Sequence, residues 1–239
     1  MIDTHAHLDA LDEDPADVIE RAREAGVTRI LTVGTAQAVE LAERFADVWA
    51  IVGIHPHDSA TGDIDEVRRL QGHPKAVAVG ETGLDWFRDY APRPKQLHLF
   101  EQMLDVAVTT GKPAVIHTRA ADSDTLAALE RYEGRVVLHC FSSPRLLPTA
   151  LERGWYVSFA GNATYPNASE LRLAATQVPA DRILAETDCP YLAPQPVRGR
   201  RNEPAYVTHT LAALASARGE TLADLEARID ANATACFRL

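Results

Sequence analysis

The chain has 239 residues with 24 basic and 34 acidic side chains, which gives a net charge of −10. This balance argues against a broad, non-specific nucleic-acid binder, but it does not exclude a nuclease, because bound cations and a few arginines can reverse the field inside a cleft. No apolar run reaches the roughly 18 residues that span a bilayer, and the first residues lack the basic segment of a secretory signal. The three cysteines form no C-x-x-C pair, which suits a reduced, cytoplasmic protein.

Eight short apolar segments rich in β-branched residues recur along the chain, and each is typical of a strand. In chain order they are 2–8, 27–34, 48–54, 75–83, 112–118, 134–140, 154–160 and 181–187. Amphipathic patterns at 14–26, 93–111 and 168–178 predict helices between them, and several patterns end in a glycine where a helix C-cap falls. A proline- and arginine-rich loop at 192–204 precedes two last helical patterns, 205–219 and 221–235.

Strict alternation of strand and helix predicts a parallel sheet with crossover helices. Eight such units in 239 residues suit an α/β fold of the (β/α)8 TIM-barrel type, which has about 250 residues. The competing open, doubly wound sheet would be favoured by a glycine-rich phosphate fingerprint after the first strand, and HLDALDEDP at 7–15 has none. Because no interdomain linker is visible, we predict a single domain over residues 1–239.

Histidines and acids gather at the predicted strand ends, where a TIM barrel carries its active site. The histidines are His5 and His7 after the first strand, His55 and His57 after the third, His117 at the fifth and His139 at the sixth, and the acids are Glu81 and Asp85 after the fourth strand and Glu186 and Asp188 after the eighth. An isolated strand histidine is most often structural, but six in one ring with carboxylates would form a poorly satisfied polar cluster at low dielectric. A divalent cation resolves that difficulty because it takes neutral imidazole and carboxylate as ligands.

Strand alternation sorts the neighbours of this ring. His5 and His7 share the inward face, so one ion could be held by both, and Asp3 on the same face could orient an imidazole. Cys140 directly follows a histidine and should point outward into the helix layer. Cys189 lies beyond the last strand and is expected in a loop.

Glu186 and Asp188 also share a face, so both could point inward. The position of Asp188 nearer the mouth favours it as a ligand. Glu186 is then expected to give hydrogen-bonding support.

These residues resemble the pattern of the amidohydrolase superfamily, with His-x-His on strand 1, histidines ending strands 5 and 6, and an aspartate ending strand 8. Many dinuclear members have a carboxylated lysine at the end of strand 4, where this chain has Glu81. A glutamate there, with the segments GIHPH, GETGLDW, HCFS, ETDCPYLAP and RGRRNEP, is similar to the TatD family of metal-dependent deoxyribonucleases, from residue 2 to about residue 235. Ser143, where the family has glycine, and the closing segment DANATACFRL depart from the pattern without touching a proposed ligand.

The resemblance implies a TIM barrel of the metal-dependent hydrolase type with two divalent ions, which could be Zn, Mn, Ni or Mg. One ion would be held by His5, His7, Glu81 and Asp188, and the second by Glu81, His117 and His139. The residue type at position 81 supports this arrangement, because a carboxylate has two oxygens and can bridge two ions. Glu81 and Asp188 are the expected catalytic residues: a metal-activated hydroxide would attack a phosphodiester phosphorus, and Asp188 would hold and deprotonate the water.

Arginines at the same rim are expected to bind the flanking phosphates, because a guanidinium gives two parallel hydrogen bonds to phosphate. They are Arg119, two residues past His117, and Arg198, Arg200 and Arg201 in the loop after the eighth strand. The alternative for the loop arginines is plain solvation.

His55 is expected to donate to a substrate oxygen, or else to cap the chain before Pro56. Trp86 and Phe87, just past the fourth strand, could stack on bases or be buried under the barrel rim.

The predicted substrate is DNA, with RNA possible, cleaved by 3'-5' exonuclease action, and the predicted protein is a monomer without membrane contact. The alternative is an amidohydrolase-type enzyme acting on a lactone or cyclic amide, for which replacing Arg119 should hardly matter. A third hypothesis, a metal-loaded scaffold without hydrolysis, is disfavoured by the intact set that includes Glu81 and Asp188.

Overall fold

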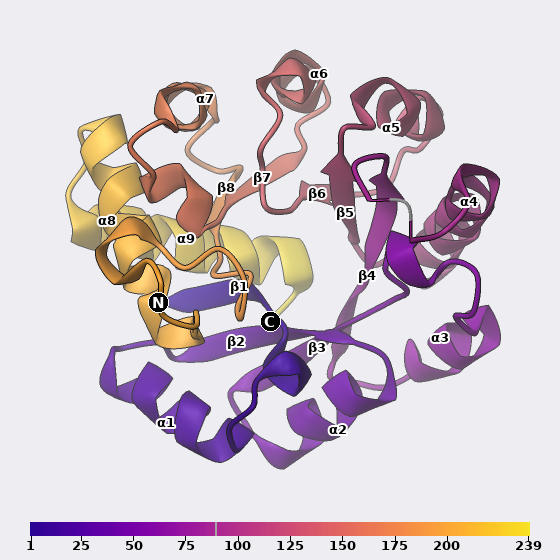
Figure 1. Cartoon of the computed structure of the whole chain (residues 1–239), viewed down its shortest axis with the longest axis horizontal. Coiled ribbons are helices and arrows are strands. Elements are labelled where there is room, and N and C mark those ends of the chain that lie inside the picture. Colours follow the sequence, from indigo (N-terminus) through magenta and orange to yellow (C-terminus); the bar gives the residue numbers. More distant parts are fainter. Residues whose placement is uncertain (89) are drawn as a thin grey trace.

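The computed structural model describes residues 1–88 and 90–239. Eight parallel strands pair in sequential order, from the first to the eighth, and curve into a barrel surrounded by helices (Figure 1). The strands are β1 (Ile2–Ala6), β2 (Arg29–Gly34), β3 (Val48–Val52), β4 (Ala76–Asp85), β5 (Ala114–Arg119), β6 (Val136–Leu138), β7 (Tyr156–Phe159) and β8 (Ile183–Ala185). The predicted α/β fold, an eight-stranded TIM barrel, is confirmed.

Helices fill the connections between strands, as the amphipathic patterns predict. They are α1 (Pro15–Glu24), α2 (Ala36–Arg44), α3 (Ile64–Leu70), α4 (Arg93–Thr110), α5 (Asp122–Leu129), α6 (Leu147–Glu152), α7 (Ser169–Gln177), α8 (Val207–Arg218) and α9 (Leu222–Phe237). Gly111 and Gly219 follow α4 and α8 with φ of 64° and 67°, the left-handed conformation that ends a helix. Within the described ranges, none of these helices has the length and apolarity needed to cross a membrane.

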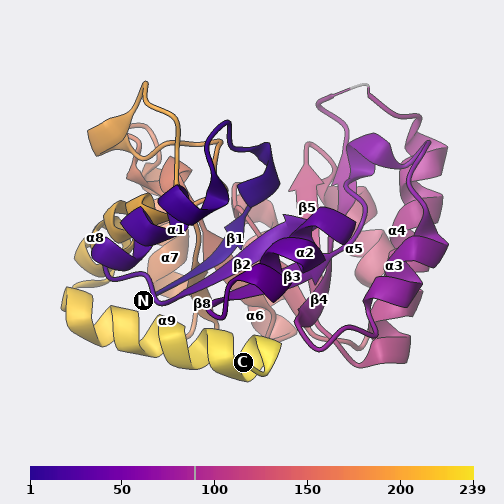
Figure 2. The ribbon, with the colours of Figure 1, turned by 90° about the horizontal axis from the view of Figure 1, so that it is seen from below.

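The barrel closes between its first and last strands. The His7 N–H donates to the Cys189 carbonyl at 2.8 Å, and the Asp188 N–H donates to the His5 carbonyl at 2.9 Å. Seen from the side, the loops after β1, β4 and β8 rise from one end of the barrel and α9 lies across the other (Figure 2). The closure therefore places His5 and His7 beside the acidic segment that follows β8.

Seven of the eight strands are shorter than predicted, and β6 and β8 differ most from the prediction. The sequence predicts strands at 134–140 and 181–187, but β6 ends at Leu138 and β8 ends at Ala185. Beyond them the chain turns out of the sheet, with left-handed φ values of 45° at Cys140 and 56° at Asp188. Side chains past those points are therefore directed by loop geometry, and strand alternation no longer applies to them.

All residues of strand β4 are buried, including its polar residues Glu81 and Asp85. The strand packs against β5 so closely that a Cβ on Gly83 would lie 2.0 Å from the His117 carbonyl oxygen, and Gly83 has a φ of 137°. Only glycine accommodates both demands. This close approach brings Glu81 and Asp85, on the same face of β4, next to His117.

Candidate metal centre

The six residues predicted as metal ligands converge at the carboxyl end of the barrel. They are His5 and His7 from β1 and the loop after it, Glu81 from β4, His117 from β5, and His139 and Asp188 from the loops after β6 and β8. His5, Glu81, His139 and Asp188 are buried, and His7 and His117 are partly exposed. The cluster thus combines a closed base with a side open to solvent.

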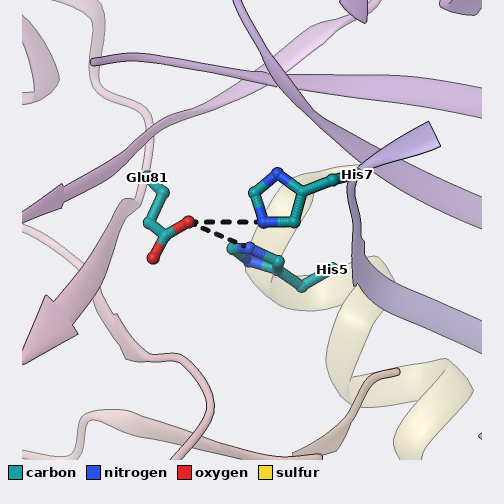
Figure 3. Close-up of side chains that lie close together, drawn as sticks. All are labelled: His5, His7 and Glu81. Carbon is teal, nitrogen blue, oxygen red and sulfur yellow. Dashed lines mark ion pairs between the residues drawn. The ribbon is translucent and has the colours of Figure 1, made fainter. Parts of the chain in front are cut away.

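Glu81 occupies the middle of this cluster, and its two oxygens face different imidazoles. Oε2 lies 3.4 Å from His5 Nε2 and 3.6 Å from His7 Nε2 (Figure 3). Oε1 lies 2.7 Å from His117 Nδ1 and 2.8 Å from His139 Nε2. Burial by itself would raise the pKa of Glu81, but the surrounding imidazoles, His139 foremost, hold that pKa well below its usual range. The residue is therefore an ionised carboxylate that presents one oxygen to each of two groups of nitrogen donors.

Asp188 completes the group on the β1 side. Its Oδ1 lies 3.5 Å from His7 Nε2 and 3.8 Å from His5 Nε2. Burial raises the pKa of this carboxyl, but the hydrogen bond from His7 and the nearby imidazoles outweigh burial and lower it below its ordinary value. Two carboxylates and two imidazoles thus face one another at distances that a small cation could span.

His5 provides a direct test of whether a cation fits. It is fully buried, yet neither of its ring nitrogens has a hydrogen-bond partner. Leaving a buried polar group unpaired costs about 1–3 kcal/mol, so such groups are rare in folded proteins. Burial lowers the pKa of His5, which favours the neutral ring that donates a lone pair to a metal. The donor set therefore fits a divalent cation.

Three sets of donor atoms in the described residues lie close enough to hold an ion. Within each set the atoms are all within 4.8 Å of one another, and the sets are His5, His7 and Glu81; His5, His139 and Asp188; and His55, Glu81 and His117. Every predicted ligand appears in at least one set.

Glu186 lies where a hydrogen-bonding support was expected. Its Oε1 is 3.1 Å from His139 Nδ1 and accepts the Cys140 N–H at 2.6 Å, and its Oε2 accepts the Ser158 hydroxyl at 2.5 Å. These bonds hold the imidazole of His139 so that its other nitrogen, Nε2, faces Glu81. Such a carboxylate fixes the tautomer and direction of a ligating histidine.

Asp85 holds a second histidine, His117, in place by contacting its outer ring nitrogen. This role was not predicted from the sequence pattern. The Asp85 Oδ2 lies 2.9 Å from His57 Nε2 and 3.3 Å from His117 Nε2, while Oδ1 accepts the N–H groups of Phe87 and Arg88. His117 is thereby held with Nδ1 toward the centre. This role could have been predicted from the sequence, because residues 81 and 85 are four apart on one strand and therefore point to the same face.

The expectation that Asp3 orients an imidazole is wrong. Its carboxyl group accepts the N–H of Thr187 at 2.9 Å, pairs with the Thr187 hydroxyl at 2.5 Å and accepts the N–H of His5 at 3.3 Å. The acid therefore ties β1 to the segment after β8 through backbone groups. It acts on His5 by fixing the main chain and leaves the ring free.

Replacing Asp3 separates the two ways in which it contributes. Asp3→Ala leaves the Thr187 and His5 N–H groups unpaired and should lower the free energy of unfolding by about 2–4 kcal/mol. Asp3→Asn keeps an acceptor and a donor at the same places as a protonated aspartate, so near pH 4 we expect a loss below about 1 kcal/mol. Urea unfolding monitored by circular dichroism measures both, and equal losses would contradict this assignment.

The same variants predict a pH dependence. Burial raises the pKa of Asp3 from its ordinary 3.8 to about 8. Between these values the folded state holds a proton that the unfolded state has released, so this group's contribution to stability falls as the pH rises through that window. Asparagine does not titrate. The parent should therefore lose stability relative to Asp3→Asn as the pH rises from 4 to 8.

Cys140 does not point into the helix layer as predicted. β6 ends two residues earlier, and the left-handed backbone at Cys140 turns its thiol toward Asp188. Burial, reinforced by the carboxylates of Asp188, Glu186 and Glu81, raises the pKa of this thiol well above its ordinary value. Cys140 is thus a protonated neighbour of the cluster. Cys189 lies beyond β8, as expected.

His55 has the expected capping role, and its second ring nitrogen faces the cluster. Its Nδ1 accepts the N–H of His57 at 3.1 Å, a capping bond at the Pro56 turn, and its Nε2 lies 3.5 Å from Glu81 Oε1. Burial lowers the pKa of His55 to about 3, so the ring is neutral. A neutral ring whose Nδ1 accepts must carry its hydrogen on Nε2. His55 therefore aims a donor at the centre of the cluster.

The candidate phosphate-binding arginines differ in their surroundings. Arg119 and Arg198 are exposed, and their guanidinium carbons lie 4.0 Å and 3.9 Å from the ring centres of Phe87 and Tyr165. Arg200 is exposed in the same loop as Arg198. Arg201 instead pairs with Asp12 and donates to the Ala10 carbonyl, so it joins the loops after β8 and β1.

Of the two predicted stacking residues, only Phe87 is exposed. Trp86 is partly buried against the core, with its indole N–H donating to Asp124 at 2.7 Å. Burial under the rim, the alternative for both residues, therefore describes Trp86 alone.

Comparison with known proteins agrees with this geometry. A family model described as "TatD related DNase" matches residues 2–238. An uncharacterized metal-dependent hydrolase, YabD, of Bacillus subtilis is 35% identical and covers 100% of this chain and 99% of its own length. The 3'-5' ssDNA/RNA exonuclease TatD of Cronobacter sakazakii is 37% identical over 95% of this chain and 92% of its own. The crystal structure of YJJV, a TatD homolog from Escherichia coli, superposes with a TM-score of 0.93 at 28% identity, covering 100% of this chain and 98% of that one. The predicted resemblance is confirmed, and the chain belongs to the TatD related DNase family of metal-dependent hydrolases.

Proposed function

We propose that the protein is a nuclease that hydrolyses phosphodiester bonds of DNA by 3'-5' exonuclease action on single strands, with RNA as a second substrate. The observation that carries this proposal is the central position of Glu81, whose two oxygens face separate imidazole groups in a buried cluster. The name of the Cronobacter relative supports the choice of substrate. The comparisons give no support to the alternative of a lactone or cyclic amide.

Two divalent ions are proposed for the cluster. His5, His7, Glu81 and Asp188 would hold one, and Glu81, His117 and His139 the other. When bound, such ions supply Lewis acidity, which polarises phosphoryl oxygens and acidifies water. Glu186 and Asp85 would hold His139 and His117 in place, since each carboxylate contacts the ring nitrogen that faces away from Glu81.

Asp188 is proposed as the group that takes a proton from the attacking water. A general base must be ionised and must reach the reacting atoms. The lowered pKa of Asp188 keeps it ionised at neutral pH, and it lies on the β1 side of the cluster beside the partly exposed His7. The carboxylate can therefore hold the water by a hydrogen bond and accept its proton.

His55 and the exposed arginines are proposed to bind the substrate's phosphates. His55 Nε2 presents its hydrogen toward the centre, where a phosphate oxygen would accept it. Arg119 ends β5, two residues beyond His117, and Arg198 and Arg200 lie in the loop after β8. Arg201 is left out of this proposal, because Asp12 already neutralises it.

The test uses purified protein and end-labelled single- and double-stranded DNA with zinc, manganese, nickel or magnesium ions. We expect mononucleotides to be released from the 3' end of single strands, with the activity abolished by a chelator and restored by added ion. Light scattering on the same preparation checks the predicted monomer. The proposal is wrong if no ion supports phosphodiester cleavage, and a scaffold function would then be favoured.

A further inference from the structure

Exposed aromatic side chains gather at the same end of the barrel as the histidine cluster. Six large apolar side chains are exposed in the described part of the chain, and three of them are aromatic: Phe87 (60%), Tyr90 (64%) and Tyr191 (57%). The other three, Val108, Leu173 and Leu222, lie on helices α4, α7 and α9. Phe87 and Tyr90 belong to the loop after β4, and Tyr191 belongs to the loop after β8. The loop after β4 follows the strand that carries Glu81, and the loop after β8 contains Asp188 as well as Tyr191.

Two of these rings touch the histidines directly. The Tyr191 ring meets His7 edge to face, with ring centres 5.8 Å apart, and the Tyr90 ring meets His57 in the same way at 4.7 Å. His57 in turn shares Asp85 with His117. One aromatic ring therefore borders the β1 side of the cluster, and another borders its β4–β5 side.

Positive charge accompanies the aromatic rings of the loop after β4. The Arg119 guanidinium carbon lies 4.0 Å from the ring centre of Phe87. The guanidinium carbon of Arg88 lies 5.4 Å from the ring centre of Phe87 and 5.9 Å from that of Tyr90. A ligand for this surface must offer flat π-faces and negative charge together. Nucleotides do, since the base stacks on an aromatic ring or a guanidinium and the phosphate pairs with the cation.

The bases must also be unpaired, because the faces of a base inside a duplex are covered by its neighbours. A lipid or an apolar peptide would use the exposed rings but would gain nothing from their division into two groups. A strand whose scissile phosphodiester lies at the cluster would instead place one nucleotide on each side. The geometry therefore favours a single strand.

We propose that Tyr191 on one side, and Phe87 with Tyr90 on the other, stack on the bases of the two nucleotides that flank the scissile bond. This proposal rests on the proposed nuclease function and names the residues that recognise the bases. They are binding residues, separate from the carboxylates that act on the phosphodiester.

The test couples protein variants to substrates that lack one base. Single-stranded oligonucleotides carry a tetrahydrofuran abasic unit at the terminal or the next position, and kcat/KM is measured for the parent, Phe87→Ala, Tyr90→Ala and Tyr191→Ala. Base–aromatic stacking corresponds to roughly tenfold per base, so we expect the parent to lose about tenfold when a stacked base is removed. Each variant should lose about tenfold on the intact strand and show little further loss on the abasic strand to which it is coupled. Leu173→Ala, an equally exposed residue on α7, is the matched control and should behave as the parent.

Binding measured without turnover keeps this inference separate from the proposed function. Fluorescence anisotropy in the presence of chelator gives the Kd for intact and abasic strands, and Phe87→Trp, which keeps a π-face, should restore the preference for the intact strand. If no strand is cleaved but the parent prefers intact strands and the alanine variants do not, the nuclease proposal fails and the stacking proposal stands. If strands are cleaved but every variant discriminates intact from abasic strands as the parent does, stacking is refuted. An equal loss on intact and abasic strands would indicate a structural role and would also refute it.

Discussion

Replacing Glu81 by glutamine should lower kcat by about 10³-fold or more, because cations at such a site supply several kcal/mol of transition-state stabilisation. Glutamine has the shape of glutamate but has one oxygen and one N–H₂ group. Whichever way it is turned, one side of the cluster would face a donor in place of an acceptor. The side chain is almost completely buried among imidazoles, so water cannot replace the lost charge. We therefore expect fewer bound ions as well as a lower rate.

Ion content by mass spectrometry and rate on a single-stranded oligonucleotide are measured on the same preparation, with circular dichroism as a check on folding. Glu43→Gln is the matched control, since Glu43 also pairs with an imidazole, His73 at 3.0 Å, but on the exposed surface. That variant should bind ions and cleave DNA as the parent does. A Glu81→Gln protein that keeps the parent's ion content and rate would remove the basis for a bridging carboxylate.

The candidate centre could be predicted because its residues obey local rules. His5 lies on β1 and His7 one residue past its end, so their spacing of two still brings both rings to Glu81. The barrel then assembles all strand ends at one mouth, so residues far apart in sequence converge once the strand–helix alternation is recognised. This rule alone was enough to predict that Glu81 and His117 lie at the mouth of the barrel, since both are near the carboxyl ends of their strands.

Features that depend on pairs of loops could not be predicted. Asp3 pairs with Thr187, which is 184 residues away, and Arg201 pairs with Asp12 across the same closure. The sequence around each of these residues does not indicate which distant residue it pairs with. Cys140 was misplaced because a strand was extended past the point where the backbone turns to positive φ.

The exposed aromatic residues illustrate the same limit. Phe87 was singled out because it follows a strand directly. Tyr90 and Tyr191 lie in irregular loops, where no periodicity distinguishes a ring at the mouth from a ring on the core. Their exposure and their contacts with His57 and His7 became visible only in the folded chain.

Asp188→Asn should lower kcat by about 10²–10⁴-fold, the range that general-base catalysis contributes. Asparagine matches aspartate in size and is, with aspartate, the residue that best tolerates the left-handed backbone found here, with φ of 56°. The N–H of residue 188 still donates to the His5 carbonyl, so the barrel closure is kept. What is lost is a carboxylate whose pKa stays low beside His7. The expected protein is folded and nearly inactive.

The shape of the pH profile decides whether the loss reflects this carboxylate. Asparagine cannot take a proton, so added hydroxide should partly restore the rate of Asp188→Asn as the pH rises, while the parent should not gain in the same proportion. Asp181→Asn, an exposed aspartate shortly before β8, is the control and should keep the parent's rate and profile. If Asp188→Asn cleaves as fast as the parent, Asp188 cannot be the base. If its rate is low but its pH profile is parallel to the parent's, the residue serves the geometry of the cluster, and the proton must leave by another group.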